Sequence, residues 1–143
     1  MGGAGYDVLY GGWGNDTMYG DAPVAADTDR TDWLDGGPGE DSMYGGGGGD
    51  HLYGGYGSYF DYMWGQGGDD WLEGGDGNDY LNGASGDDFL RGGYDYDYLD
   101  GGEGSDRVYG GDGYDPVNPN GLEYNPYDHY EWDYADEFHP VPY

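Results

Sequence analysis

The sequence predicts an all-β fold: a right-handed parallel β-roll, or β-solenoid, of about six coils. Three observations carry this prediction. A nine-residue period runs in tandem from residue 2 to residue 118 and forms twelve units. Within each unit the sixth position is aspartate and the eighth is aliphatic or methionine. Glycine supplies 35 of the 143 residues and gathers in the first four positions of the units. Short units repeated at a fixed period build a fold by stacking on one another.

The units follow each other along the chain with two interruptions. The first unit, GGAGYDVLY, spans residues 2–10 and leads directly into the second. The third unit, residues 20–35, carries seven extra residues, and the sixth, residues 54–64, carries two. The strict period resumes at Gly65 and ends at Asn118. We therefore expect both insertions to be accommodated in loops without loss of register.

Each unit combines a glycine turn with a short strand. Glycine permits the positive φ angles that a tight turn requires, and the last three positions hold strand-forming residues. Because side chains alternate along a strand, only the eighth position faces inward. Two units then form one coil, so odd and even units build two short-stranded parallel sheets, with coils every ~4.8 Å and a roll of roughly 29 Å. The expected core is Leu9, Met18, Leu34, Met43, Leu52, Met63, Leu72, Leu81, Leu90, Leu99, Val108 and Val117.

The charge of the chain limits its partners. Thirty-one acidic residues against three arginines give a formal net charge of -28. Such a chain repels itself unless a cation joins the structure. It offers no basic patch for nucleic acid or for an anionic membrane. There is no cysteine, so disulfides cannot compensate for a small core, and a metal is the usual alternative. We find no apolar run long enough to span a membrane and no cleavable signal at the start of the sequence.

The repeats GGPGEDSMY, GGDGNDYLN and GGEGSDRVY resemble the RTX (repeats in toxin) pattern GGxGxDxUx, where U is a large aliphatic residue. The resemblance covers residues 2–118. It implies a parallel β-roll that binds calcium in its turns, in proteins that bacteria export, commonly through an uncleaved C-terminal segment. An extracellular, secreted location is the corresponding expectation.

In the family, each calcium ion sits between two turns stacked on the same edge of the roll, with one aspartate from each turn. Calcium takes six to eight oxygen ligands, so backbone carbonyls must complete each site. Carried over here, one edge would use Asp7, Asp32, Asp50, Asp70, Asp88 and Asp106. The other edge would use Asp16, Asp41, Asp61, Asp79, Asp97 and Asp115. The ceiling is about ten ions, which would bring the net charge to about -8.

Some units depart from the pattern, and we expect the sites that touch them to be the weakest. The third unit lacks a clear GGxG before its aspartate, and the sixth inserts Tyr59 and Phe60 near its turn. Asp95 replaces a fourth-position glycine. Gln66 and Ala84 replace second-position glycines and give up backbone freedom.

The outward positions of the strands are unusually aromatic. One sheet should carry two neighbouring columns, Tyr19, Tyr44 and Trp64 beside Tyr62, Tyr80 and Tyr98. The other sheet should carry Trp33, Trp71 and Phe89. Aromatic residues favour strands and stack along a ladder, which is one explanation. Contact with a partner is the explanation we prefer, because two flat aromatic faces exceed what soluble monomers normally expose.

Residues 119–143 abandon the period for tyrosine, proline and acidic residues, and we expect this C-terminal tail to dock on the roll or on a neighbour. At the other end, Met1 leads straight into the first unit without a cap. An uncapped terminal coil favours head-to-tail stacking into a filament. Truncation of a larger protein explains the same feature.

Three functions compete. The first is an extracellular structural protein that folds on calcium and self-assembles through its aromatic faces and open edge into a fibre or coat. The second is a calcium-dependent binding module for a polysaccharide or a protein partner. The third is the RTX portion of a larger secreted toxin or hydrolase. We predict no enzymatic activity for this sequence, because His51, His129 and His139 lie in no recognisable catalytic spacing.

Overall fold

A computed structural model describes residues 1–21, 30–112, 117–118 and 129–130. Strands are the repeating element of this part of the chain, which contains no helix and therefore no helix able to cross a membrane. The strands are β1 (Val8–Tyr10), β2 (Thr17–Tyr19), β3 (Trp33–Asp35), β4 (Ser42–Gly47), β5 (His51–Gly55), β6 (Tyr62–Gly67), β7 (Trp71–Asp76), β8 (Tyr80–Ser85), β9 (Phe89–Tyr94), β10 (Tyr98–Glu103), β11 (Arg107–Asp112), β12 (Val117–Asn118) and β13 (His129–Tyr130).

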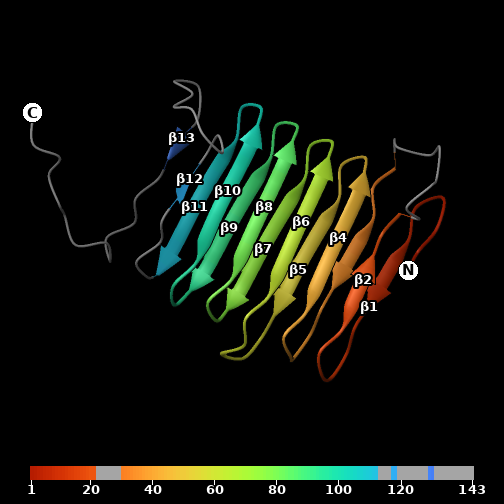
Figure 1. Ribbon diagram of the computed structural model, residues 1–143, viewed down its shortest axis with the longest axis horizontal. Coiled ribbons are helices and arrows are strands. Elements are labelled where there is room, and N and C mark those ends of the chain that lie inside the picture. The colour runs from red at the N-terminus through yellow and green to blue at the C-terminus, as the bar shows by residue number, and fades with distance from the viewer. Residues whose placement is uncertain (22–29, 113–116, 119–128, 131–143) are drawn as a thin grey trace, which may run out of the picture.

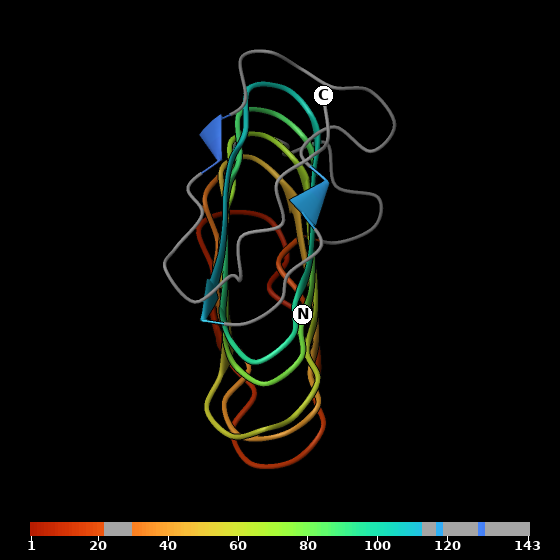
Figure 2. The ribbon, with the colours of Figure 1, turned by 90° about the vertical axis from the view of Figure 1, so that its left-hand side faces the viewer.

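The strands form two parallel sheets that face each other. The odd sheet has the order β1-β3-β5-β7-β9-β11-β13, and the even sheet has the order β2-β4-β6-β8-β10-β12. The chain passes from one sheet to the other at every turn, so the strands of the two sheets run in opposite directions (Figure 1). Viewed from the end, the coils nest as flat, elongated loops with one sheet on each long side (Figure 2). The architecture is the all-β parallel solenoid that the repeat predicts.

The register follows the nine-residue period across both insertions. Thr17 pairs with Ser42, 25 residues on, because the third unit carries seven extra residues. Ser42 pairs with Tyr62, because the sixth unit carries two. From Tyr62 to Asn118 each pairing joins residues 18 positions apart, as in Tyr62 with Tyr80. Both insertions therefore leave the coil register intact, as predicted.

Most strands are longer than the three residues predicted for them. Strands β4 and β6 to β11 have six residues each, because pairing continues through the first three positions of the next unit. In the pair β8–β10, for example, Ala84 lies opposite Gly102. Glycine is a poor strand former, yet its backbone N–H and C=O groups pair as well as any others once coils are stacked on both sides. The turn proper is thus confined to the fourth to sixth positions.

The core consists of the eighth-position side chains. Ten of them are buried, from Met18 at 5% exposed to Leu72 and Leu81 at 0%. Leu9 packs against this cluster but is only partly buried, because β3 is the one described strand that pairs with β1. Nothing is described for the side chain of Val117. One aliphatic residue per unit makes a narrow core, which by itself gives limited hydrophobic stabilisation.

The aromatic side chains form rows on the outer faces, as predicted. In the first even row, the ring centroids of Tyr19 and Tyr44 are 4.8 Å apart and those of Tyr44 and Trp64 are 4.7 Å apart, with interplanar angles of 8° and 3°. In the second even row, Tyr80 stacks on Tyr98 at 5.1 Å and Tyr62 is tilted against Tyr80. The odd row contains one member that was not predicted. His51 lies between Trp33 and Trp71 and stacks on both.

The tail is described at two residues only. His129 and Tyr130 form β13, which pairs in parallel with β11 through Arg107–His129 and Val108–Tyr130. These residues extend the odd sheet instead of lying across its outer face. The predicted docking of the remaining tail concerns residues 119–128 and 131–143, which lie outside the described part.

Candidate metal centre

The turns place one aspartate per unit at the edge of the roll. In the turn between β8 and β9, Gly86 has φ +134°, and Asp87 and Asp88 follow it before the strand begins at Phe89. Asp88 is the sixth-position residue and is 2% exposed. Because the strand starts immediately after the aspartate, its carboxylate is directed into the roll and the next inward residue is Leu90. Local turn chemistry therefore creates one buried acid per turn from Asp32 to Asp106.

The buried aspartates form two columns joined by hydrogen bonds. The backbone N–H of each aspartate donates to Oδ1 of the aspartate one coil further on, at distances of 2.7 to 2.9 Å. The odd column contains Asp7, Asp32, Asp50, Asp70, Asp88 and Asp106. The even column contains Asp16, Asp41, Asp61, Asp79 and Asp97. These are the two predicted edges, with Asp115 outside the described residues.

The second carboxylate oxygen has no comparable partner along most of both columns. Oδ2 is buried and accepts no hydrogen bond in the described structure at Asp7, Asp16, Asp32, Asp41, Asp50, Asp70, Asp79 and Asp88. Buried polar atoms in folded proteins are nearly always satisfied, and a buried carboxylate oxygen without a partner is costly. A buried carboxylate oxygen without a partner, repeated along both columns, fits a positively charged ligand.

The first-position glycines show where such a ligand would be held. A Cβ built on Gly36 would lie 2.5 Å from Asp41 Oδ2 and 2.7 Å from the carbonyl oxygen of Gly54 on the next coil. The same two kinds of oxygen crowd Gly2, where both distances are 2.6 Å. The Gly54 carbonyl already accepts from the Gly37 N–H at 3.1 Å, which leaves its second lone pair. Acidic and carbonyl oxygens thus converge beside a glycine that has no side chain to separate them.

Burial and mutual repulsion oppose ionisation of these columns. Burial raises the pKa of Asp70 to about 8 and those of Asp50, Asp61, Asp79 and Asp88 to about 7. The hydrogen bond from a backbone N–H lowers each value, and neighbouring column carboxylates raise it. Burial is also the main reason why the pKa values of Asp32 and Asp41 are raised. At neutral pH the columns therefore need a cation to stay buried and charged.

The donor set fits a hard cation. No three His, Cys, Asp or Glu side chains converge in the part of the chain described, so carboxylates alone cannot complete a site. Carboxylate and carbonyl oxygens together form the ligand set that calcium prefers, and the absence of nitrogen and sulfur ligands argues against zinc. The residues that would hold calcium are the column aspartates, with carbonyls of the glycine turns.

The irregular units keep their place in the columns. Asp32, after the long insertion, is joined to both Asp7 and Asp50. Asp61, after Tyr59 and Phe60, is joined to both Asp41 and Asp79. The insertions therefore do not displace the carboxylates, although we expected sites near them to be the weakest. Whether their turns hold metal equally well stays a prediction.

A second ladder, on the outside of the turns, was not predicted. Fifth-position side chains accept hydrogen bonds from fifth-position N–H groups one coil on, as in Asp87 N–H to Asp69 Oδ1 (2.9 Å) and Ser105 N–H to Asp87 Oδ1 (3.0 Å). Asn78 accepts from the Tyr96 N–H at 2.9 Å in the same way. This ladder runs in the opposite sense to the aspartate columns. The sequence signal is a short polar residue at the fifth position, which turn-forming propensity alone also explains.

Comparison with known proteins agrees with this site. A model of the RTX calcium-binding nonapeptide repeat matches the chain in four copies, at residues 1–22, 27–60, 56–90 and 82–115. RTX repeats bind calcium, and proteins that contain them are typically secreted. No curated protein and no solved structure shows a significant match.

Proposed function

The chain belongs to the family of RTX calcium-binding nonapeptide repeats, and we propose that calcium bound along its two aspartate columns folds it into an extracellular structural protein. We assign the roll to residues 2–118 and the tail to residues 119–143. Twelve units, two to a coil, make a right-handed roll of about six coils. The gaps between stacked turns then offer at most about ten calcium sites. We assign no catalytic role to the described residues.

The repeated orphan oxygen is the observation that carries this proposal. Eight aspartates bury an oxygen that has no hydrogen-bond partner in the described structure. The chain carries 31 acidic residues and a net charge of -28, so carboxylates repel one another across the whole roll and not only within one site. A divalent ion between stacked turns would satisfy these oxygens and reduce the repulsion along each column. Metal binding and folding are then one process.

The usual secretion of RTX proteins also supports an extracellular role. RTX proteins are typically secreted, and calcium outside the cell reaches the range in which extracellular modules bind it, with dissociation constants of about 10⁻⁴ to 10⁻³ M. A chain that needs several such ions to fold stays unfolded where calcium is scarce. The proposed roll would therefore form after export.

The test is circular dichroism in chelator and then with increasing calcium. At neutral pH we expect strand signal to appear only with calcium. Asp70→Asn should raise the calcium concentration at the midpoint roughly tenfold, because it removes a charged ligand from the centre of the odd column. Glu103→Gln removes the same charge from an exposed position and should leave the midpoint unchanged. A full strand spectrum in chelator at neutral pH, or equal effects of both variants, would contradict the proposal.

Self-association through the aromatic rows is the second function that we propose. Trp33 is 42% exposed and Trp71 is 43% exposed, in a row that crosses four strands of the odd sheet. In such rows the ring faces are covered by neighbouring rings, so mainly ring edges meet the solvent. Sugar rings prefer an aromatic face, whereas a second aromatic row can interdigitate with ring edges. This geometry favours a second copy of the roll over a polysaccharide as the partner of the rows.

The N-terminal coil offers a further contact for such assembly. Among the described residues, strand β1 pairs only with β3. Val8 and Tyr10 of this strand are 46% and 72% exposed, and Tyr6 just before it is 63% exposed. An exposed strand edge templates pairing with another chain.

Electron microscopy and sedimentation of the calcium-loaded protein test assembly. We expect filaments or sheets, and we expect the double variant Trp33→Ser, Trp71→Ser to be monomeric. Trp13→Ser is the matched control, because Trp13 is 92% exposed but lies outside the rows. A monodisperse monomer of the unaltered chain, or assembly that survives the double variant, would exclude this role for the odd row.

A further inference from the structure

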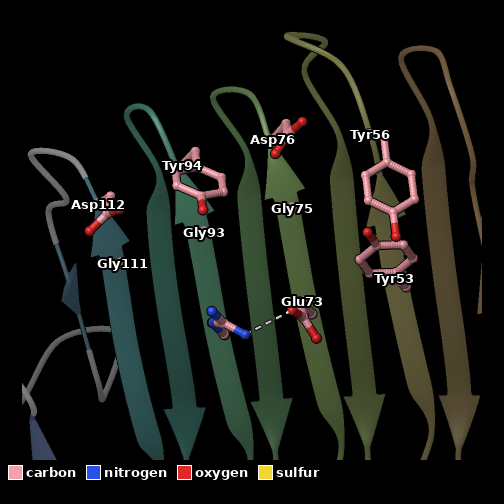
Figure 3. Close-up of a pocket in the computed structure, with 10 residues that line it drawn as sticks. Tyr53, Tyr56, Glu73, Gly75, Asp76, Gly93, Tyr94, Gly111 and Asp112 are labelled. Atoms are coloured by element: carbon pink, nitrogen blue, oxygen red, sulfur yellow. Dashed lines mark hydrogen bonds and ion pairs between the residues drawn. The ribbon is translucent and has the colours of Figure 1, made fainter.

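A shallow groove of about 270 Å³ crosses the outer face of the odd sheet, over strands β5, β7, β9 and β11 (Figure 3). It lies on the outer side of the sheet, and no column aspartate lines it. Its long direction follows the roll axis, because its lining residues recur at equivalent positions on successive strands. Its volume is close to the lower end of the range for small-ligand sites, enough for one or two small rings.

The floor of the groove is bare backbone. Gly75, Gly93 and Gly111 lie at second positions, opposite one another in the sheet. A Cβ on Gly93 would overlap the carbonyl oxygen of Gly75, so the floor cannot carry side chains. The strands beneath are paired on both sides, which leaves no edge for an added peptide strand. The floor therefore suits a ligand that lies flat on the sheet.

Two tyrosines present their ring faces to this groove. Tyr56 and Tyr94 are 69% and 58% exposed, and Figure 3 shows both rings broadside over the strands. Tyr53 packs against Tyr56 in an edge-to-face contact, with ring centroids 5.7 Å apart. Tyr94 stacks on no other ring within the described ranges. In this respect the groove differs from the aromatic rows, whose faces are already used.

Charged groups alternate with these rings. Along the third positions the order on successive strands is Tyr56, Asp76, Tyr94 and Asp112, one every ~4.8 Å. On the opposite wall, Arg91 Nη1 pairs with Glu73 Oε1 at 3.0 Å, the contact drawn as a dashed line in Figure 3. Three carboxylates thus face one guanidinium that is already paired. This excess of acceptors disfavours anionic ligands, and the charged lining disfavours purely apolar ones.

We propose that this groove binds a neutral saccharide. The C–H face of a sugar ring would lie on Tyr94, and its hydroxyl groups would donate to the carboxylates of Asp76 and Asp112. Hydrogen bonds to charged acceptors are stronger than neutral ones, and they orient a ligand that aromatic contact alone would leave free to slide. Tyr56 lies two strands from Tyr94, a separation of about 9.6 Å. This is close to the length of a disaccharide, so Tyr56 can contact a second sugar ring. The inference goes beyond calcium-dependent folding and needs only the folded roll.

The test is calorimetry on the full chain in saturating calcium, against neutral β-linked gluco-, manno- and galacto-oligosaccharides. Alginate serves as the polyanionic comparator and tetramethylammonium as the cationic one. We expect a neutral oligosaccharide to bind, and Tyr94→Ala to weaken it at least about tenfold. Tyr94→Phe should keep the affinity within about twofold, because the ring face is retained. Tyr10→Ala, a change at a 72% exposed tyrosine of the same sheet outside the groove, should have no effect.

A second variant tests the polar half of the site. Asp112→Asn lies in an exposed position and should weaken binding several-fold without altering the circular dichroism spectrum in calcium. No binding by any neutral saccharide, tighter binding of alginate or tetramethylammonium, or binding unaffected by both Tyr94→Ala and Asp112→Asn would overturn the proposal. Failure of calcium-dependent folding would appear instead in the circular dichroism control, so the two proposals fail separately.

Discussion

The odd and even sheets of the roll are alike inside and different outside. Inside, each strand from β2 to β11 carries one buried leucine, methionine or valine, and each sheet edge carries one column of aspartates. Outside, the second positions of the odd sheet are all glycine, at Gly12, Gly37, Gly55, Gly75, Gly93 and Gly111. The even sheet has Asp21, Gln66 and Ala84 among its second positions. Equal interiors and unequal exteriors indicate that the inner residues build the roll, while the outer ones are free to serve another purpose.

Without calcium, low pH should stabilise the folded protein by protonating the aspartates of both columns. This is the largest effect that we expect. The native pKa values of about 7 to 8 in both columns exceed those of unfolded aspartate, near 3.8. Between about pH 4 and pH 8 the folded chain therefore binds more protons than the unfolded chain, and its stability falls as pH rises. In chelator, strand signal should be stronger at pH 5 than at pH 8.

Calcium should reverse this dependence, because the ion favours the ionised carboxylates and protons compete with it. Circular dichroism across pH, with and without calcium, is the measurement. Asp70→Asn in the odd column and Asp79→Asn in the even column should reduce the pH dependence equally, while Glu103→Gln leaves it unchanged. A response confined to one column would show that the two interiors are not equivalent.

Much of the interior could be predicted from the sequence, because the interior repeats. Aspartate and an aliphatic residue recur at fixed positions, so the period alone gives the columns and the core, even across the insertion before Asp32. Strand length could not be predicted in the same way. Strand propensity predicts that each strand ends where the glycines begin. In the structure the backbone of these positions still pairs with the neighbouring coils, as Ala84 does with Gly102. Tertiary pairing overrides local preference here.

The exterior could be predicted less well, because it depends on which positions share a face and on how rings are turned. Spacing placed Trp33 and Trp71 in one row but gave no reason to add His51, whose ring stacks between them. The groove depends on Tyr94 lying broadside beside Asp76 and Asp112, on three different units. The repeat predicts the residues that all units have in common. The groove is formed by side chains that differ from one unit to the next, so the repeat does not predict it.

The glycine row of the odd sheet should be sensitive to substitution. Gly75 has φ +111°, beyond the left-handed helical region that L-residues tolerate, and a Cβ there would overlap the Gly55 carbonyl oxygen. Gly75→Ala should lower the free energy of unfolding in calcium by about 2 to 4 kcal/mol, through backbone strain and overpacking. Urea denaturation at fixed calcium is the measurement. A loss below about 0.5 kcal/mol would mean that the backbone of the odd sheet adapts as easily as that of the even sheet.

The even sheet should respond in the opposite direction and by less. Gln66 and Ala84 occupy the corresponding positions at φ 82° and 77°, close to the left-handed helical region, so their backbone has already shifted to admit a side chain. Ala84→Gly relieves strain of about 1 to 2 kcal/mol but gives the unfolded chain more freedom, leaving a net gain of about 0.5 to 1 kcal/mol. The same denaturation experiment measures it. A destabilised Ala84→Gly variant would mean that the alanine is preferred for its contacts, and the exteriors of the two sheets would then differ for packing reasons and not because one was kept open.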